Sequence, residues 1–124
     1  AYGVDLVECY LDAALTEATS IQNYTTPVGW PEKFDLSYCC DVLEHLRPHD
    51  VTPSLEVIRE HTKGEAFFSI ASAKDECGKR IGKTLHLTVE PVEFWFKQLY
   101  VFWDRVEWFC PELSKPWRNC FVCR

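Results

Sequence analysis

The apolar run Ala66 to Ala71 constrains the fold of this chain more than any other segment. Its residues show no regular alternation of polar and apolar types, which is typical of a strand that is covered on both faces. Strands of that kind occur mainly in sheets whose parallel neighbours are connected by helices. The run therefore predicts a fold in which strands and helices alternate along the chain.

The rest of the sequence follows this alternation and predicts an α/β sheet, mostly parallel, with an antiparallel hairpin at its carboxyl-terminal edge. Thr52 is expected to cap a helix that begins at Pro53, and Gly64 is expected to end it. Apolar residues at helical spacing predict two further helices, over Leu11 to Ala18 and Pro91 to Leu99. The remaining strands are expected at Tyr2 to Val7, Asn23 to Val28, Phe34 to Cys40, Arg105 to Cys110 and Arg118 to Cys123.

Length and charge exclude several classes of protein. The 124 residues carry 13 basic and 19 acidic side chains, for a net charge of −6, and we expect one domain over residues 1–124. The scattered basic residues argue against a nucleic-acid surface, and no apolar stretch approaches the roughly 18 residues of a membrane helix. Seven cysteines without a secretory signal favour free thiols in a reducing compartment, so we expect a cytoplasmic protein. Because the chain contains no Met, we expect that residues have been removed from its front or that it is an internal piece of a longer gene product.

Polar residues at the ends of predicted strands are the candidate functional residues, because open α/β sheets bind ligands at the carboxyl ends of their strands. Asp5 closes the first strand and is either a ribose-binding carboxylate or a carboxylate favoured by a helix dipole. Asp41, Glu44 and His45 follow the third strand, although a solvated turn explains Asp41 equally well. His86 precedes the last helix and is either functional or a core histidine with satisfied hydrogen bonds.

Three segments of the chain together resemble the class I S-adenosylmethionine-dependent methyltransferases. They are Gly3 to Leu6, Phe34 to Leu46, which contains the run Asp-Val-Leu-Glu-His, and Phe67 to Ile70. The segment Ile81 to Val89, together with Trp95, is similar to the version found in phage and environmental members. The resemblance extends from the family's second strand to its seventh and implies a Rossmann-like sheet with S-adenosylmethionine as cofactor.

The resemblance also implies roles for individual residues. Asp5 would bind the ribose of the cofactor, and Leu6 would lie along its adenine. Glu44, His45 and His86 would face a methyl acceptor that the sequence does not identify, with one imidazole as general base. The other cofactor-binding residues would be Val28, Gly29 and Trp30 on the adenine side, and Cys40, Asp41 and Val42 at the methionine end.

One feature of the family is absent from the chain. The glycine-rich loop G-x-G-x-G, which follows the family's first strand, has no counterpart among the five glycines. That strand is the central one of the family's sheet, so we expect a domain that is truncated at its amino end and lacks its middle strand. Either the first predicted strand then pairs directly with the Phe34 to Cys40 strand, or a strand is borrowed from a second copy of the chain.

Two other functions stay open beside the methyltransferase. A non-catalytic, methyltransferase-like module would bind a partner through the open sheet. A metal-dependent enzyme would use Glu44, His45 and His86, since imidazoles and a carboxylate suit a divalent metal. Against that, the adjacent side chains of Glu44 and His45 are expected to point in different directions, so no metal is expected. For the methyltransferase we predict that His45 and His86 lie on the same side of the molecule, within reach of one small ligand.

Overall fold

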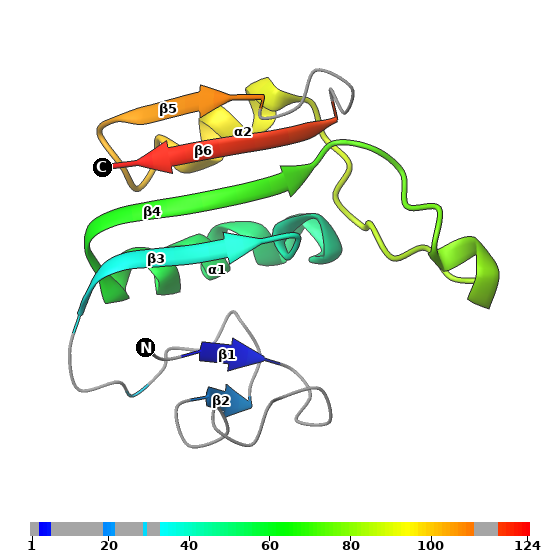
Figure 1. Ribbon diagram of the computed structural model, residues 1–124, viewed down its shortest axis with the longest axis horizontal. Coiled ribbons are helices and arrows are strands. Elements are labelled where there is room, and N and C mark those ends of the chain that lie inside the picture. The colour runs from blue at the N-terminus through cyan, green and yellow to red at the C-terminus, as the bar shows by residue number, and fades with distance from the viewer. Residues whose placement is uncertain (1–2, 6–18, 22–28, 30–32, 111–116) are drawn as a thin grey trace.

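The structure, a computed structural model, describes residues 3–5, 19–21, 29, 33–110 and 117–124. Its strands form two sheets (Figure 1). The smaller sheet is two-stranded and consists of β1 (Gly3–Asp5) and β2 (Thr19–Ile21). The larger sheet has the order β3-β4-β6-β5, with β3 at Phe34–Cys40, β4 at Thr62–Ala71, β5 at Val106–Phe109 and β6 at Arg118–Cys123.

The pairing of the strands is mixed. β1 with β2 and β3 with β4 are parallel, whereas β6 is antiparallel to both β4 and β5. The predicted α/β architecture and the antiparallel carboxyl-terminal hairpin are confirmed. The sheet is mixed rather than mostly parallel over the described residues, because the reversed strand β6 lies between two others and so contributes two antiparallel pairings.

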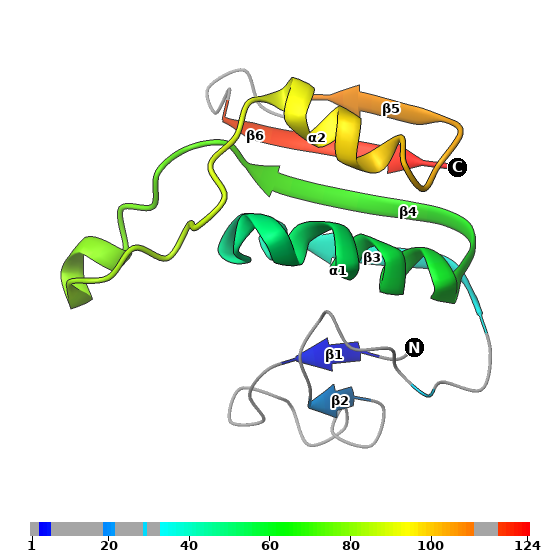
Figure 2. The same ribbon diagram turned by 180° about the vertical axis from the view of Figure 1, so that it is seen from behind.

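β1 lies beside β3 without pairing to it. In both views β1 lies on the side of β3 away from β4, separated from β3 by a gap, and the two strands run in the same direction (Figures 1 and 2). Within the part of the chain that the structure describes, the ladder of β1 is made with β2 and that of β3 with β4. The expected direct pairing of the first strand with the Phe34–Cys40 strand is therefore wrong for the single chain. A strand of three residues offers few ladder hydrogen bonds, so little is gained by closing it onto β3.

Two helices cover one face of the four-stranded sheet. α1 (Pro48–His61) and α2 (Val92–Leu99) both lie behind the sheet in Figure 1 and in front of it in Figure 2. α2 starts directly after Pro91, where a helix was predicted. The side chains between helices and sheet are fully buried and form the core: Val51 and Leu55 of α1, Ala66, Phe68 and Ile70 of β4, Trp95 and Leu99 of α2, and Phe121 of β6.

The opposite face of the same sheet is only partly covered. Leu36 and Tyr38 of β3 are 60% and 73% exposed. The Tyr38 ring stacks on Phe67 of β4 with centroids 5.3 Å apart, and Phe67 contacts Phe109 of β5 at 6.3 Å. The expectation that the Ala66 to Ala71 strand is covered on both faces is therefore half right. Helices cover one face, and a row of three aromatic rings lies on the other.

α1 begins at Pro48 and not at Pro53 as predicted. Pro48 is at the start of the helix, where a backbone N–H would have no partner within the helix, so its missing N–H costs no hydrogen bond. Arg47 is the N-cap residue. Pro53 lies inside the helix, where it removes one hydrogen bond to the preceding turn. Thr52 donates its hydroxyl to Gln98 of α2 at 2.8 Å and does not cap the helix. Both prolines satisfy the rule for a helix start, so the sequence pattern did not distinguish them.

Gly64 lies in β4 and does not end the helix, which stops at His61. The register of β3 against β4 shifts at this point, where β4 carries one extra residue. A Cβ atom on Gly64 would collide with the backbone carbonyl of Asp35. The glycine is therefore required by the close approach of two strands and not by a helix terminus.

Several expectations concern segments at the margins of the sheet. The predicted helix Leu11 to Ala18 and the predicted strand Asn23 to Val28 lie outside the described residues, and β2 at Thr19–Ile21 stands in a stretch where no strand was expected. The charged segment Ser72 to Lys83 leaves the sheet as an excursion, as predicted, and contains a short 3-10 helix at Gly78–Ile81. Among the helices of the described residues, none is long and apolar enough to cross a membrane.

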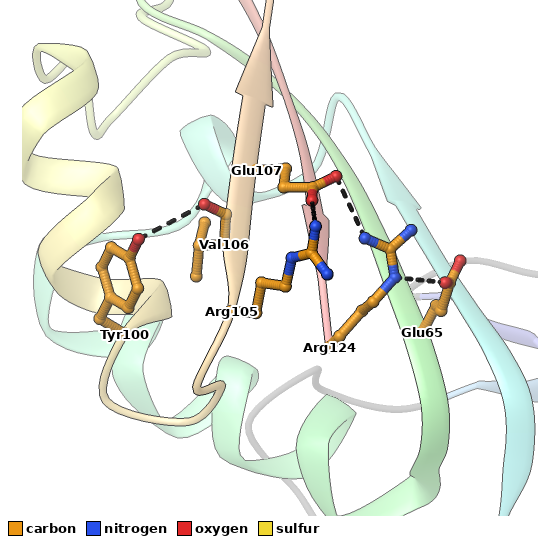
Figure 3. A network of polar contacts seen from close by, with 6 residues as sticks. All are labelled: Glu65, Tyr100, Arg105, Val106, Glu107 and Arg124. Carbon is orange, nitrogen blue, oxygen red and sulfur yellow. Dashed lines mark hydrogen bonds and ion pairs between the residues drawn. The ribbon is translucent and has the colours of Figure 1, made fainter.

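A network of charged side chains ties the end of β6 to its neighbours (Figure 3). Arg124 donates to Glu65 of β4 at 2.5 Å and to Glu107 of β5 at 3.1 Å. Arg105 forms a further ion pair with Glu107. The hydrogen bond from Arg124, aided by the charge of Arg105, lowers the pKa of Glu107 below its usual value. These contacts join three strands at the end of the sheet opposite the carboxyl end of β4.

Candidate functional site

The chain turns sharply after β3 at the carboxyl edge of the sheet. Asp41, the first residue after β3, has a positive φ of 52°, a conformation that Asp tolerates better than most residues. Its N–H donates to the carbonyl of Ser69 in β4 at 2.9 Å, and its carboxylate pairs with Arg118 at 3.2 Å. A 3-10 turn, Leu43–His45, follows after one further residue. The turn places two of the predicted site residues directly beyond the end of β3.

Glu44, in the middle of this turn, is fully buried although it is a charged residue type. Its Oε1 accepts a hydrogen bond from the N–H of Ala71 at 3.1 Å, whereas its Oε2 is buried and has no hydrogen-bond partner among the described residues. Burial raises the pKa of the Glu44 carboxyl group, and hydrogen bonds from backbone N–H groups oppose that rise. A buried carboxylate oxygen without a partner is uncommon in folded proteins, which marks Oε2 as an atom that needs an explanation.

Backbone hydrogen bonds hold a distant segment against Glu44. The N–H groups of Leu87 and Thr88 both donate to the Glu44 carbonyl oxygen, at 2.8 and 3.0 Å. The hydroxyl of Thr88, which is buried, donates to the carbonyl of Leu46 at 2.7 Å. These three bonds fix the two residues that follow His86 to the turn that carries His45.

The imidazole rings of His45 and His86 lie edge to face, with centroids 4.8 Å apart and planes at 89°. The prediction that they lie on the same side of the molecule, within reach of one small ligand, is confirmed. Nδ1 of His45 is 3.1 Å from the carbonyl oxygen of Leu85, and Nδ1 of His86 is 2.6 Å from that of Ala73. Because a carbonyl oxygen only accepts hydrogen bonds, each Nδ1 is the donor, and Nε2 of each neutral ring keeps its lone pair.

Glu44, His45 and His86 form one cluster, which we call the Glu-His-His cluster. One carboxylate oxygen and one nitrogen of each ring all lie within 4.8 Å of one another. The expectation that the side chains of Glu44 and His45 point in different directions is therefore wrong. Neighbouring residues of a 3-10 turn are about 120° apart around its axis, so the backbone does direct the two side chains apart, and the length of the Glu44 side chain brings its carboxylate back to the imidazoles. The cluster opens to solvent on the side of His45, since Glu44 is buried, His86 half-buried and His45 exposed.

Asp75 adds negative charge near the two imidazoles. Its carboxylate accepts hydrogen bonds from the N–H of Gly78 and, at 2.9 Å, from that of Cys77. Desolvation acts to raise the pKa of Asp75, but these hydrogen bonds outweigh it and lower the pKa overall, and His86 and His45 act in the same direction. The sequence analysis did not select Asp75. The spacing of Asp75 from Gly78 is typical of a capped turn and so indicates only local structure. Nothing in this local pattern indicates that Asp75 lies near His45.

The predicted cofactor-side residues are placed in part. Asp5 is the last residue of β1 and Cys40 the last of β3, and Asp41 and Val42 follow β3 directly. Because β1 and β3 run in the same direction, these strand ends lie at the same edge (Figures 1 and 2). Gly29 is exposed, and none of the described residues comes within 4 Å of the position that a Cβ atom would take there. Leu6, Val28 and Trp30 lie outside the described residues.

Two solved methyltransferases are similar to this chain in structure. The N-methyltransferase NodS from Bradyrhizobium japonicum WM9, in complex with S-adenosyl-L-homocysteine (SAH), matches with a TM-score of 0.57 and 14% sequence identity, over 97% of this chain and 62% of the NodS chain. Magnesium protoporphyrin IX methyltransferase (ChlM) from Synechocystis PCC 6803, with bound SAH, matches with a TM-score of 0.54 and 16% identity, over 85% of this chain and 49% of the ChlM chain. No family model and no curated protein matches the sequence.

These likenesses establish the fold. The chain has the Rossmann-like α/β fold of methyltransferases, as its sequence resemblance implied. It spans 62% of the NodS chain and 49% of the ChlM chain, so it corresponds to a part of each structure.

Proposed function

We propose that this chain is part of an S-adenosylmethionine-dependent methyltransferase and carries the acceptor side and a portion of the cofactor side of its active site. The observation that carries this proposal is the convergence of Glu44, His45 and His86 at the carboxyl edge of the sheet. Open α/β sheets bind their ligands at that edge. The fold that the chain shares with two SAH-bound methyltransferases supports the same conclusion.

The proposed division of roles follows the order of the strands. Carboxylates at the ends of β1 and β3, from Asp5 and Asp41, suit the hydroxyl and amino groups of the cofactor. Asp5 would accept the ribose hydroxyls, and Cys40, Asp41 and Val42 would border the methionine end. S-Adenosylmethionine supplies a methyl group on a positively charged sulfur. The adenine side would be formed by Leu6, Val28, Gly29 and Trp30.

The Glu-His-His cluster would face the methyl acceptor. Its three lone pairs favour the loss of a proton from an oxygen or nitrogen nucleophile, which makes the nucleophile's attack on the methyl group easier. The proposal includes no identified acceptor. The similarity of Ile81 to Val89 and Trp95 to phage and environmental members supports placing the chain in that branch of the family.

Binding of SAH tests the proposal directly. In calorimetry on the 124-residue chain, we expect Asp5→Ala to weaken binding by roughly 1.5–3 kcal/mol, the range for a hydrogen bond to a charged group. Asp35→Ala is the matched control, because this exposed carboxylate lies at the amino end of β3 and pairs with Lys63 at 3.1 Å. Equal affinity in wild type and Asp5→Ala would assign Asp5 to helix capping instead.

A non-catalytic module that binds a partner is the second candidate function. It is favoured by the lack of pairing between β1 and β3 and by the exposure of Leu36 and Tyr38. We propose that the position between β1 and β3 is that of the family's first strand, and that a second copy of the chain fills it when no other strand does. Light scattering checks this: a dimer that dissociates on dilution is expected, and a monomer at all concentrations contradicts it. Failure of SAH to bind, together with a dimer, would favour the module over the enzyme.

The cytoplasmic location stays a prediction. Cys39, Cys40, Cys77, Cys120 and Cys123 are free thiols, as expected for a reducing compartment. The sequence analysis favours such a compartment, and no membrane partner is proposed.

A further inference from the structure

We propose that Glu44, His45 and His86 bind a divalent transition-metal ion of the Zn²⁺ type. Two imidazoles and one carboxylate are the ligand set of a common kind of catalytic zinc site, in which three protein ligands leave a further position open. The side chains come from two segments that are distant in the sequence, and the backbone bonds from Leu87 and Thr88 to Glu44 hold those segments together.

Both imidazoles already have the orientation that metal-binding histidines need. A ligating histidine almost always donates its other ring N–H to a carbonyl or carboxylate, which fixes the tautomer and directs the free nitrogen to the metal. Here Nδ1 of His45 and Nδ1 of His86 are held by the carbonyl oxygens of Leu85 and Ala73. With Nδ1 engaged in each ring, Nε2 is the nitrogen that either imidazole can offer to a metal ion.

The carboxylate of Glu44 supplies the second, independent observation. Its side chain is fully buried, Oε1 is held by the N–H of Ala71, and Oε2 has no hydrogen-bond partner among the described residues. A buried oxygen of this kind is rarely left without a partner in a folded protein. A cation bound beside the two imidazoles would give Oε2 its missing partner.

The distances fit a site that closes slightly when the ion binds. Metal–ligand bonds of about 2.0–2.2 Å place neighbouring ligand atoms of a tetrahedral zinc site about 3.3–3.6 Å apart. The three ligand atoms here lie within 4.8 Å of one another, so they would draw closer together as the ion binds. The negative charge of Asp75, which acts on both imidazoles, favours a cation at the same place.

The consequence for methyl transfer rests on the proposed function. The open position would hold the nucleophilic oxygen or nitrogen of the acceptor, so the acceptor class is one with a hydroxyl or amine that can bind Zn²⁺. Because the lone pairs of the cluster would then bind Zn²⁺, coordination would take the place of an imidazole base: it lowers the pKa of that group, and the proton passes to water. The freed electron pair then forms the bond to the methyl carbon as the bond from that carbon to the sulfonium sulfur breaks, and SAH is released.

Metal titration of the 124-residue chain, stripped of metal and without cofactor, tests the site. We expect one Zn²⁺ or Co²⁺ per chain, with the visible absorption of Co²⁺ bound by imidazole nitrogen, and no comparable binding of Mg²⁺, which prefers oxygen ligands. His45→Ala, His86→Ala and Glu44→Gln should each weaken Zn²⁺ binding by about 100-fold or more, since loss of an outer-shell partner alone costs 10- to 100-fold. His49→Ala is the control, because its side chain is exposed and lies on α1.

The readouts separate the possible failures. Circular dichroism of each variant shows whether it is folded, and His45→Ala carries the test if the variants of the buried or half-buried ligands are not. Binding that survives His45→Ala, or a Co²⁺ spectrum with an intense thiolate band from the cysteines, would overturn the site. If SAH binds but Zn²⁺ does not, the metal proposal fails and the methyltransferase proposal stands. If Zn²⁺ binds but SAH does not, the metal site stands and the methyltransferase proposal fails.

Discussion

The two faces of the four-stranded sheet differ, although the same strands form both. On the face under α1 and α2, Ala66, Phe68 and Ile70 of β4 are completely buried. On the other face, Phe67 of the same strand is half-buried between the rings of Tyr38 and Phe109. Successive residues of a strand point to opposite faces, so one segment contributes to both environments. The apolar character of a strand therefore does not tell how many of its faces the chain itself covers.

The two faces also contribute differently to the stability of the fold and to the apolar surface that the protein exposes. The covered face holds the large fully buried side chains and so contributes most of the hydrophobic stabilisation. The open face bears a shallow apolar groove lined by residues of three neighbouring strands. Its lining is formed by Leu36, Tyr38, Glu65, Ala66, Phe67 and Val122.

The largest expected effect comes from truncating neighbouring phenylalanines on the two faces. Phe68→Ala should lower the free energy of unfolding by about 3–5 kcal/mol, the range for a buried aromatic ring. Phe67→Ala should lower it by about 1–2 kcal/mol, because much of that side chain's surface stays in contact with water. Urea denaturation of the two variants measures both. Equal losses would show that the open face is covered in solution.

A smaller effect is expected at the residue that sets the register of β3 against β4. A one-residue slip would exchange the two faces, so the comparison depends on this register. Gly64→Ala should destabilise the chain by about 1–3 kcal/mol, because the added Cβ meets the carbonyl of Asp35 and the strands must move apart. Gly29→Ala is the control, with a change below about 0.5 kcal/mol, since none of the described residues places an atom within 4 Å of its Cβ position. Equal urea midpoints for the two variants would argue against the register shift.

The smallest effect is expected from the charged network at the end of the sheet. The pKa of Glu107 is lower in the folded chain than its usual value of 4.5, so its ion pairs stabilise the fold above that pH. The stabilisation is lost as the pH falls through the folded pKa and the carboxylate takes up a proton. Glu107→Gln should therefore lower the urea midpoint slightly at pH 7, and by less as the pH is lowered toward 3.

Salt provides the control for this prediction. Because the pair is exposed, the difference at pH 7 should shrink in 1 M NaCl. A difference between wild type and Glu107→Gln that is the same at pH 3 and pH 7 would show that the side chain acts through packing and not through charge.

The sequence predicted those elements whose ends are marked by their own residues. Phe34–Cys40 was predicted at both ends, because an aromatic-rich run stops at Asp41, which takes the left-handed turn. The α1 start and the role of Gly64 were missed for different reasons. Two prolines satisfy the same start rule, and the need for a glycine arises from Asp35 on another strand.

The sequence predicted which side chains meet at the candidate site. It did not predict the backbone groups that orient them. His45 and His86 were expected to meet because strand ends of an open sheet converge. Their orientation depends on the carbonyl oxygens of Leu85 and Ala73, and every residue carries such a group. No residue type in the sequence marks which carbonyl will be used, so this part of the site required coordinates.

The hydrogen bonds at the base of the Ser72 to Lys83 excursion have a consequence for the lengths that this segment can have. The imidazole of His86 is bonded to Ala73, and the backbone beside it is bonded to Glu44, so both ends of the excursion are fixed where it leaves and rejoins the fold. Its tip includes Gly82, which is exposed and has open space around it. Doubling the length of a flexible loop costs only about 0.6 kcal/mol of closure entropy. Insertions at this tip would thus change what the excursion can contact while Glu44, His45 and His86 stay in place.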